Sequence, residues 1–384
     1  MSTSRHNALR VLRHRLFALS AGALLILLGA NLDAASIGSA NPYAGQVQQM
    51  YVAYYGRPGD PEGVDYWAGR LAEVGGNWIA DLVNAFGTSA EYTERFAELA
   101  NETLIDNLYL QLFNRIAEPV GRSFYIDLLG GTNLSGLNPS LRRSTLAEIA
   151  LDIANGALNQ DALTLANKLE VAASFTTGIR ATAHGYDSYD IPLAVRLMAT
   201  VDDGQPSVTT ADTYIDAFLA GIGSGTFRVG DDIAPGTYAS LQDGGCYWAR
   251  LSGFSGESAD LIANDFVSQP GPGIVTIDPT DVGFESTRCG TWIADILPLA
   301  LSPEAPRASG TYRVGRDMRA GTWIADNLDG GCYWERLEGF SGTFADILAN
   351  DYMGDPGQVV VLIDSEDAGF YSSRCGIWTF WLEP

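Results

Sequence analysis

The sequence has very little of the chemistry on which most enzymes depend. It contains three histidines and a single lysine, Lys168, and two of the histidines lie in the first 36 residues, which leaves His184. A Gly-x-Ser-x-Gly elbow, a His-Glu-x2-His pair and a Walker loop are all absent. A Ser-His-Asp or Cys-His system would have to use His184, in a weakly structured connecting region. Acidic residues are many, but no pair stands in a context typical of a glycoside hydrolase. The sequence therefore predicts a protein that is not an enzyme, with a hydrolase as the less favoured alternative.

Positive charge is also scarce. The 23 Lys and Arg residues face 46 Asp and Glu residues, for a net charge of −23. Such a field repels phosphate backbones and no basic cluster offsets it, so we expect no nucleic-acid partner. A solvated acidic surface explains the charge, and a calcium-binding surface is the alternative. Asp60, Glu62 and Asp65 fit neither an EF-hand nor a calcium-binding nonapeptide repeat. We therefore assign no metal ligands and no cofactor, and keep calcium as an open alternative.

Long apolar runs are missing as well. The longest, Leu16 to Leu28, follows four arginines and precedes small residues near Ala35. Its length of about 13 residues is short of the roughly 20 that a membrane-spanning helix needs. This order predicts a signal peptide over residues 1–36. The mature chain is expected to be soluble, with a net charge of −26 after loss of four arginines and one aspartate.

Cysteine is absent from the first 245 residues, and the four that follow belong to a repeat. The motif Gly-Gly-Cys-Tyr-Trp occurs twice, and a second cysteine follows each copy at the same distance. Zinc is disfavoured because there is no Cys-x2-Cys spacing and no nearby histidine. Four cysteines in an exported chain indicate two disulfides, with three pairings open. The duplication favours Cys246–Cys289 and Cys332–Cys375.

Residues 41–220 follow a helical pattern with an internal repeat offset by 58 residues. The positions that define its motif are Tyr51, Arg57, Asp60, Gly63 and Trp67 in the first copy, and Arg115 at the place of Arg57 in the second. Asp60 precedes a proline and is expected to cap the next helix. For Arg57 and Arg115 we expect structural bonds to carbonyls of the turn, or to Asp60 and Glu118, rather than a ligand-binding role.

The pattern Tyr-x3-Tyr/Phe-Gly-Arg-x2-Asp-Pro-x-Gly-x2-Tyr-Trp resembles the bacterial family catalogued as domain of unknown function 4214. The resemblance covers about residues 41–220. It implies a helical bundle of an exported or surface-layer protein, and it carries over no catalytic residues. The second copy departs from the pattern, because it lacks the glycine after Phe113 and has Glu118 in place of the aspartate.

The C-terminal part switches to a period of two, which predicts strands. Short strands and Gly/Pro turns predict a small antiparallel sandwich or barrel at residues 225–295 and another at 310–384. The predicted fold is thus multidomain α plus β, with an all-α helical bundle followed by two small β-sandwich or barrel domains. The β unit is similar to a disulfide-paired repeat of secreted and surface-exposed bacterial proteins. Trp248 and Trp334 are expected to pack on the disulfides, and a sugar-stacking platform is the alternative.

Two arginines recur at the same place in both β units, Arg250 and Arg336. We expect them to form structural ion pairs with the Asp260/Asp346 or the Asp278/Asp364 positions.

These features predict a secreted or cell-surface-associated, non-catalytic binding or adhesion protein with duplicated β modules. Its partner would be a surface glycan, or an envelope or extracellular protein. The alternative is a structural, self-assembling component of the envelope or extracellular matrix. We expect an extracellular or cell-surface location, with the periplasm as the alternative.

Overall fold

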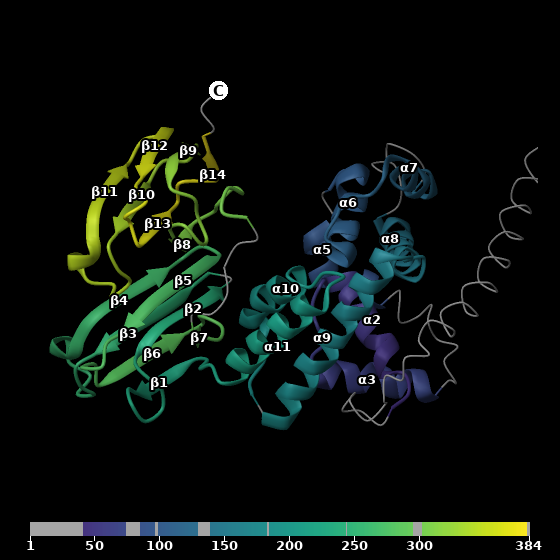
Figure 1. The fold of residues 1–384 in the computed structure, drawn as a ribbon, viewed down its shortest axis with the longest axis horizontal. Helices are drawn as coiled ribbons and strands as arrows, with labels where there is room; N and C mark the ends of the chain where they lie inside the picture. The colour runs from purple at the N-terminus through teal and green to yellow at the C-terminus, as the bar shows by residue number, and fades with distance from the viewer. Residues whose placement is uncertain are drawn as a thin grey trace, which may run out of the picture. The chain divides into compact units, whose positions relative to one another are not determined.

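The computed structural model describes residues 41–73, 85–96, 99–129, 139–182, 184–242, 244–294 and 302–381 (Figure 1). The predicted signal peptide lies outside these residues. The chain divides into two compact units. The helical unit runs to residue 181 and includes residues 201–212, and the C-terminal unit comprises residues 182–200 and the chain from 213 onward. Helices come first and two repeated units of antiparallel strands follow, so the predicted fold class is confirmed.

The helices are α2 (Ala44–Tyr55), α3 (Pro61–Glu73), α5 (Ala90–Phe96), α6 (Asn101–Phe113), α7 (Pro119–Leu128), α8 (Pro139–Asn155), α9 (Gln160–Thr182), α10 (Ile191–Ala199) and α11 (Gln205–Leu219), with the 3-10 turn η2 (Ser188–Asp190). The sequence repeat shows in the way that α2 and α6 end. Gly56 after α2 has φ 63° and Asn114 after α6 has φ 58°, the left-handed conformation that glycine and asparagine tolerate best. Both helices therefore stop at the same point of the motif.

Aromatic rings fill the core of the helical unit. The Tyr51 and Tyr55 rings lie 5.6 Å apart, and Phe86 contacts both at 5.0 and 5.1 Å between ring centroids. In the second copy, the Tyr109 and Phe113 rings are 5.5 Å apart. One helical turn separates the two rings of each pair, which places them on the same face of the helix.

Lys168 on α9 is completely buried. Its ammonium donates hydrogen bonds to Gln111 O at 2.6 Å and to Asn114 Oδ1 at 2.8 Å, at the C-terminal end of α6. A cation is favoured there because helix carbonyls are unsatisfied at that end. Burial nevertheless lowers the pKa of Lys168 to about 7.

Each β repeat is a pair of antiparallel sheets. The first repeat (residues 225–294) has a four-stranded sheet in the order β1-β6-β3-β4 and a three-stranded sheet in the order β5-β2-β7; the second (residues 310–380) has the orders β11-β10-β13-β8 and β12-β9-β14. The strands are β1 (Gly225–Arg228), β2 (Gly236–Gln242), β3 (Cys246–Leu251), β4 (Leu261–Val267), β5 (Gly271–Ile277), β6 (Gly283–Thr287), β7 (Ile293–Ala294), β8 (Gly310–Arg313), β9 (Gly321–Asn327), β10 (Cys332–Leu337), β11 (Ile347–Met353), β12 (Gly357–Ile363), β13 (Gly369–Ser373) and β14 (Trp378–Phe380). The repeats are sandwiches, and neither closes into a barrel.

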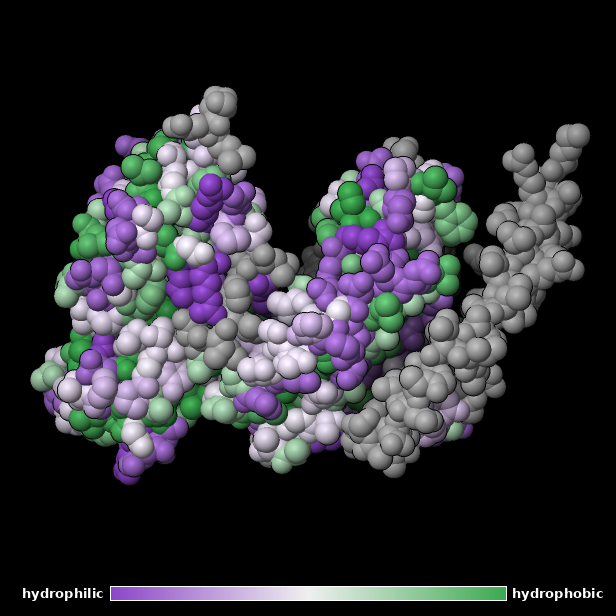
Figure 2. Space-filling view, viewed as in Figure 1, coloured by the Kyte–Doolittle hydropathy of each residue, from purple (hydrophilic) through white to green (hydrophobic). Residues whose placement is uncertain are grey.

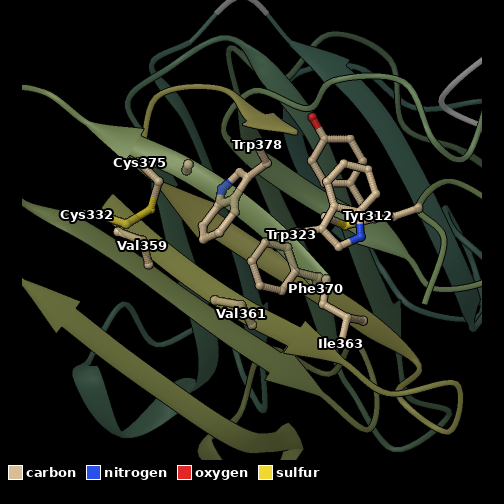
Figure 3. Packing of buried hydrophobic residues seen from close by; sticks show 11 residues of the cluster. Tyr312, Trp323, Cys332, Val359, Val361, Ile363, Phe370, Cys375 and Trp378 are labelled. Atoms are coloured by element: carbon tan, nitrogen blue, oxygen red, sulfur yellow. A yellow bond between two sulfur atoms is a disulfide. The ribbon is translucent and has the colours of Figure 1, made fainter. Parts of the chain in front are cut away.

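The core of each sandwich lies between its two sheets. In the second repeat, β12 contributes a row of alternate residues, Val359, Val361 and Ile363, beneath the rings of Phe370 and Trp378 (Figure 3). The disulfide occupies one end of this layer. All these side chains are at most 3% exposed. Alternation along β12 thus places one face in the core and the other outside.

The two β repeats pack directly against each other. Strands β5 and β8 run so close that a Cβ added at Gly271 would lie 2.1 Å from Ser309 O. Thr276 N donates to Phe340 O at 2.7 Å, and Arg250 Nη1 donates to Ser341 O at 2.7 Å. The second repeat therefore covers one face of the first.

Candidate functional site

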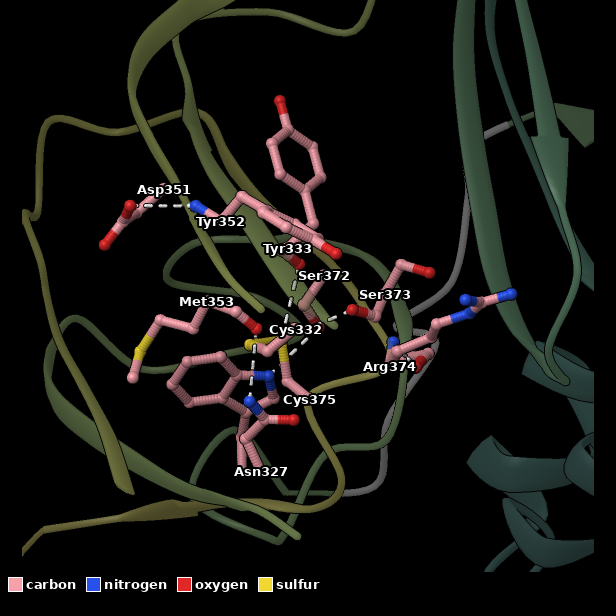
Figure 4. The surroundings of a disulfide bond; sticks show 12 residues. Asn327, Cys332, Tyr333, Asp351, Tyr352, Met353, Ser372, Ser373, Arg374 and Cys375 are labelled. Atoms are coloured by element: carbon pink, nitrogen blue, oxygen red, sulfur yellow. Dashed lines mark hydrogen bonds between the residues drawn. A yellow bond between two sulfur atoms is a disulfide. The ribbon is translucent and has the colours of Figure 1, made fainter. Parts of the chain in front are cut away.

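The cysteines form two disulfides, each within one β repeat. Cys246 is bonded to Cys289 and Cys332 to Cys375, as the duplication predicts, and all four side chains are fully buried. Figure 4 shows Asn327 beside the second disulfide, where its amide donates to Met353 O at 3.4 Å. Each disulfide joins the start of a central strand to the segment after β6 or β13, so it ties distant parts of a small sandwich together.

The tryptophans are packed into the two sandwiches. Trp292 and Trp378 are fully buried, and their indole N–H groups donate to Ser286 Oγ at 2.9 Å and Ser372 Oγ at 3.0 Å. Trp248 is 4% exposed and stacks on Phe284. Trp334 is partly buried and stacks on Phe370. They fill the cores beside the disulfides, as expected, and Trp248 also lines the cleft described below.

Arg57 and Arg115 occupy equivalent structural places in the helical unit. The Arg57 guanidinium lies 5.2 Å from the Tyr51 ring centroid, donates to Pro58 O at 3.1 Å, and pairs with Glu91 at 2.8 Å. The expected bond to a carbonyl is present. The prediction that Asp60 is the acidic partner of Arg57 is wrong. The partner is Glu91, and Asp60 Oδ1 instead accepts a hydrogen bond from the N–H of Gly63 at 2.6 Å.

That bond caps α3 in the expected way, and Asp60 Oδ2 also accepts the Tyr51 hydroxyl at 3.2 Å. A Cβ at Gly63 would lie 2.1 Å from the Tyr51 hydroxyl, so only glycine fits. Trp67 is half-buried and its ring lies 5.6 Å from that of Phe86.

Arg115 reproduces the pattern in the second copy. It donates to Ile116 O at 3.0 Å and forms ion pairs with Glu118 at 2.8 Å and Asp161 at 2.5 Å. Glu118 was expected as a partner, whereas Asp161 was not. These bonds are internal to the helical unit and give both arginines a structural role.

Arg250 and Arg336 form equivalent buried ion pairs, but not with the expected partners. Arg250 contacts Asp281 at 2.6 and 2.8 Å, and Arg336 contacts Asp367 at the same two distances. The expected positions are used otherwise: Asp260 accepts the Ser255 hydroxyl at 2.6 Å, for example. The correct partners precede the Gly-Phe strand, which lies beside β3 or β10.

A cleft of about 400 Å³ lies between the two β repeats. One wall is formed by β4 of the first repeat, and the other by β10, β13 and the segment around η4 (Phe344–Asp346) of the second. The cleft-lining residues used below are Asp265, Tyr333, Glu335, Phe344 and Tyr371. Phe344 is 93% exposed at this site. The cleft thus combines aromatic surface with three carboxylates, since Asp346 also lines it.

Two of the cleft carboxyls, Asp265 and Glu335, have raised pKa values. Burial raises the pKa of Asp265 to about 6, and the charge of Glu335 adds to this effect. Burial also raises the pKa of Glu335, although a hydrogen bond from the Tyr333 hydroxyl opposes it. Burial and the Asp265 charge raise the pKa of Tyr371. Neither carboxylate forms an ion pair with any residue that the structure describes.

Asp265 and Glu335 were missed by reasoning from the sequence. The sequence does contain a signal for this site, because the two repeats carry different residues at several positions that line the cleft. At the positions equivalent to Glu335, Phe344 and Tyr371, the first repeat has Ala249, Ser258 and Glu285. Asp265 is matched by Asp351, which is exposed because nothing in the described chain covers it. The differences between copies, rather than the identities, mark this site.

His184 packs in the C-terminal unit beside Phe218 and Thr291. Its ring lies 4.6 Å from that of Phe218, and Nε2 is 3.4 Å from Thr291 Oγ1. Burial lowers the pKa of His184. Among the described residues, no three histidine, cysteine or acidic side chains are grouped to hold a metal ion. None of the described helices is both long and apolar enough to cross a membrane.

Comparison with known proteins identifies the β repeats. The family model described as Rv1352-like extracellular domain matches the chain over residues 220–293 and again over 304–379. No curated protein and no solved structure matches the chain significantly. The matched residues leave the helical unit outside, so its resemblance to domain of unknown function 4214 stays a prediction. The C-terminal part of the chain is a duplicated extracellular β domain with two disulfides, and the protein is exported to the cell surface or the extracellular space.

Proposed function

We propose that this is a non-catalytic binding protein that holds an extracellular saccharide in the cleft between its β repeats. The observation that carries the proposal is the pair Asp265 and Glu335, two partly buried carboxyls that form no ion pair with the described part of the chain. Burying a charge without a partner is unfavourable. A ligand that supplies hydrogen-bond donors would relieve this penalty.

The other cleft residues fit the same ligand class. Saccharides offer many hydroxyl donors and an apolar ring face. Phe344 presents an almost fully exposed ring at the cleft, and Tyr371 adds a second aromatic side chain. Phe344 replaces the serine of the first repeat, so the exposed ring is a feature of the cleft rather than of the repeat.

The export of the protein is consistent with this ligand class. An extracellular domain meets surface and matrix glycans, and a net charge of −23 disfavours polyanionic ones. We therefore expect a neutral or amino-bearing saccharide. If the resemblance of residues 41–220 to the helical surface-protein family holds, the helical unit would anchor the binding module in the envelope.

The test is a saccharide array screened with the mature chain, followed by calorimetry on each hit. Glu335→Gln should weaken binding by about tenfold or more, since a hydrogen bond to a charged group contributes about 1.5–3 kcal/mol. Phe344→Ser should also weaken binding, because it removes the exposed ring on which the apolar face of a sugar would stack. Asp351→Asn is the matched control for Asp265→Asn, because it changes the equivalent carboxyl outside the cleft. Equal affinities for the wild type and both cleft variants, or no saccharide bound at all, would refute the proposal.

Self-assembly is the second candidate function. It rests on a different observation, the way in which the two β repeats dock on each other.

A further inference from the structure

We propose that the chain self-associates head to tail, with the second β repeat of one molecule binding the first β repeat of another. The contact would repeat the one that already joins the two repeats within a chain. It goes beyond saccharide binding and does not depend on it.

Each repeat has two faces that take part in this contact. The front face is formed by β4 and β5 in the first repeat, and by β11 and β12 in the second. The back face is formed by β1 and the segment 253–256 in the first repeat, and by β8 and the segment 339–342 in the second. Within the chain, the front face of the first repeat holds the back face of the second.

The front face that remains open, on the second repeat, is apolar. Ile274 on the covered front face is 5% exposed, whereas Val360 at the equivalent position is 56% exposed and Leu362, two residues on, is 66% exposed. Figure 2 shows apolar side chains interspersed with hydrophilic ones over the part of the C-terminal unit that carries β11 and β12. The front face is thus covered in the first repeat and uncovered in the second. The side chains at these positions of the uncovered face are as apolar as those of the covered one.

The open back face is shaped like the docked one. All four residues of β8 are buried, whereas in β1 three of four are exposed. Phe340, at the docked face, contacts Gly369, where an added Cβ would lie 2.4 Å from its ring. Phe254 lies over Gly283 in the same way, at 2.5 Å, and is 49% exposed. In the first repeat, the Phe254 ring therefore has the same position as the Phe340 ring at the docked face, and we call it the docking ring.

The polar groups of the contact are also duplicated. Arg250, fixed by Asp281, uses its remaining Nη1 to bind Ser341 O in the docked repeat. Arg336 is fixed by Asp367 in the same manner, but its Nη1 forms no hydrogen bond with any residue that the structure describes. The Arg336 side chain is 26% exposed, compared with 5% for Arg250. The equivalent acceptor on a second molecule is Ser255 O.

One substitution between the copies favours the contact and another opposes it. Gln269 Oε1 accepts the backbone N–H of Arg374 at 2.9 Å across the intrachain contact. The equivalent acceptor is Asp355, a carboxylate that would face Arg288 of the second molecule. Asp351 would meet Glu285 in place of Tyr371, and this repulsion between like charges should weaken the contact. The association should therefore be weaker than the intrachain contact.

The geometry is heterologous, since unlike faces meet. Such contacts generate open chains of molecules rather than a closed symmetric dimer, unless the rotation happens to close a ring.

The experiment is sedimentation velocity of the mature full-length chain over a wide concentration range. Oligomers that grow with concentration are expected. Val360→Lys blocks the open front face, and Phe254→Ala removes the docking ring of the open back face. Each variant alone should remain monomeric. A mixture of the two should form 1:1 dimers, because each retains the face that the other lacks.

Ile377→Lys is the control, since Ile377 is 56% exposed but lies outside β11 and β12. Circular dichroism of each variant checks that it folds. A wild type that stays monomeric throughout, or variants whose mixture does not associate, would overturn the proposal. Phe344→Ser should leave the association intact, which separates failure here from failure of saccharide binding.

Discussion

The equivalent arginines Arg250 and Arg336 allow the strength of the contact between the β repeats to be measured. The measure is the difference in unfolding free energy between a variant of one arginine and the same variant of the other. Arg250→Met leaves Asp281, whose side chain is 1% exposed, without its cation and also removes the 2.7 Å bond to Ser341 O. Arg336→Met leaves Asp367, 2% exposed, in the same state but breaks no bond between repeats. Removing one partner of a buried ion pair costs about 3–5 kcal/mol. The half-exposed surroundings of Arg336 place its variant near the lower value.

The additional loss in Arg250→Met is the hydrogen bond from a charged donor to the other repeat, worth about 1.5–3 kcal/mol. Urea unfolding followed by tryptophan fluorescence under non-reducing conditions measures both losses, because each sandwich contains buried tryptophans. We expect Arg250→Met to lower the free energy of unfolding further than Arg336→Met by at least that amount, because its ion pair is also the more buried of the two. Equal losses, or a larger loss in Arg336→Met, would show that the bond to Ser341 contributes nothing to the coupling of the repeats.

Two other predictions concern the same unit. Because burial raises the pKa of Asp265 from 3.8 to about 6, the folded state holds a proton that the unfolded chain releases; its stabilisation is complete below about pH 4 and is lost as pH rises through about 6. Asp265→Asn should remove this pH dependence, worth up to about 3 kcal/mol, in unfolding measured at pH 4 and pH 8, whereas Asp351→Asn should not. Replacing the disulfide Cys246–Cys289 by two serines opens a loop of 43 residues and should cost about 4 kcal/mol by chain entropy. The equivalent serine pair in the second repeat should cost the same in denaturant unfolding, and a loss well below 2 kcal/mol in both would contradict the entropic account.

The internal repeats of the sequence predict most of the structural features that form within a single copy. The turn at Gly56, the cap at Asp60 and the disulfide pairing each depend on residues whose spacing within a copy is visible. The partner of Arg57 is different, because Glu91 comes from a helix 34 residues away and only packing brings it near. Local spacing selected Asp60, which the helix N-terminus had already engaged.

The candidate site could not be predicted for a related reason. Asp265 is unremarkable in its own repeat, and the equivalent Asp351 is exposed. It becomes buried only because the second repeat docks over β4. Trp248, Trp292 and Trp378, which stand out in the sequence, are core residues. The site instead consists of positions at which one copy has diverged from the other, such as Phe344 in place of serine.

The buried Lys168 has a practical consequence for labelling. It is the only lysine of the chain, so its amine and the chain's α-amine are the only primary amines. Amine-reactive esters and aldehyde cross-linkers should therefore leave the folded surface unmodified apart from the N-terminus. Acylation of Lys168 requires the helices around it to open, and its rate in a reagent excess would report how often the helical unit opens. The protein carries its own reporter of local unfolding.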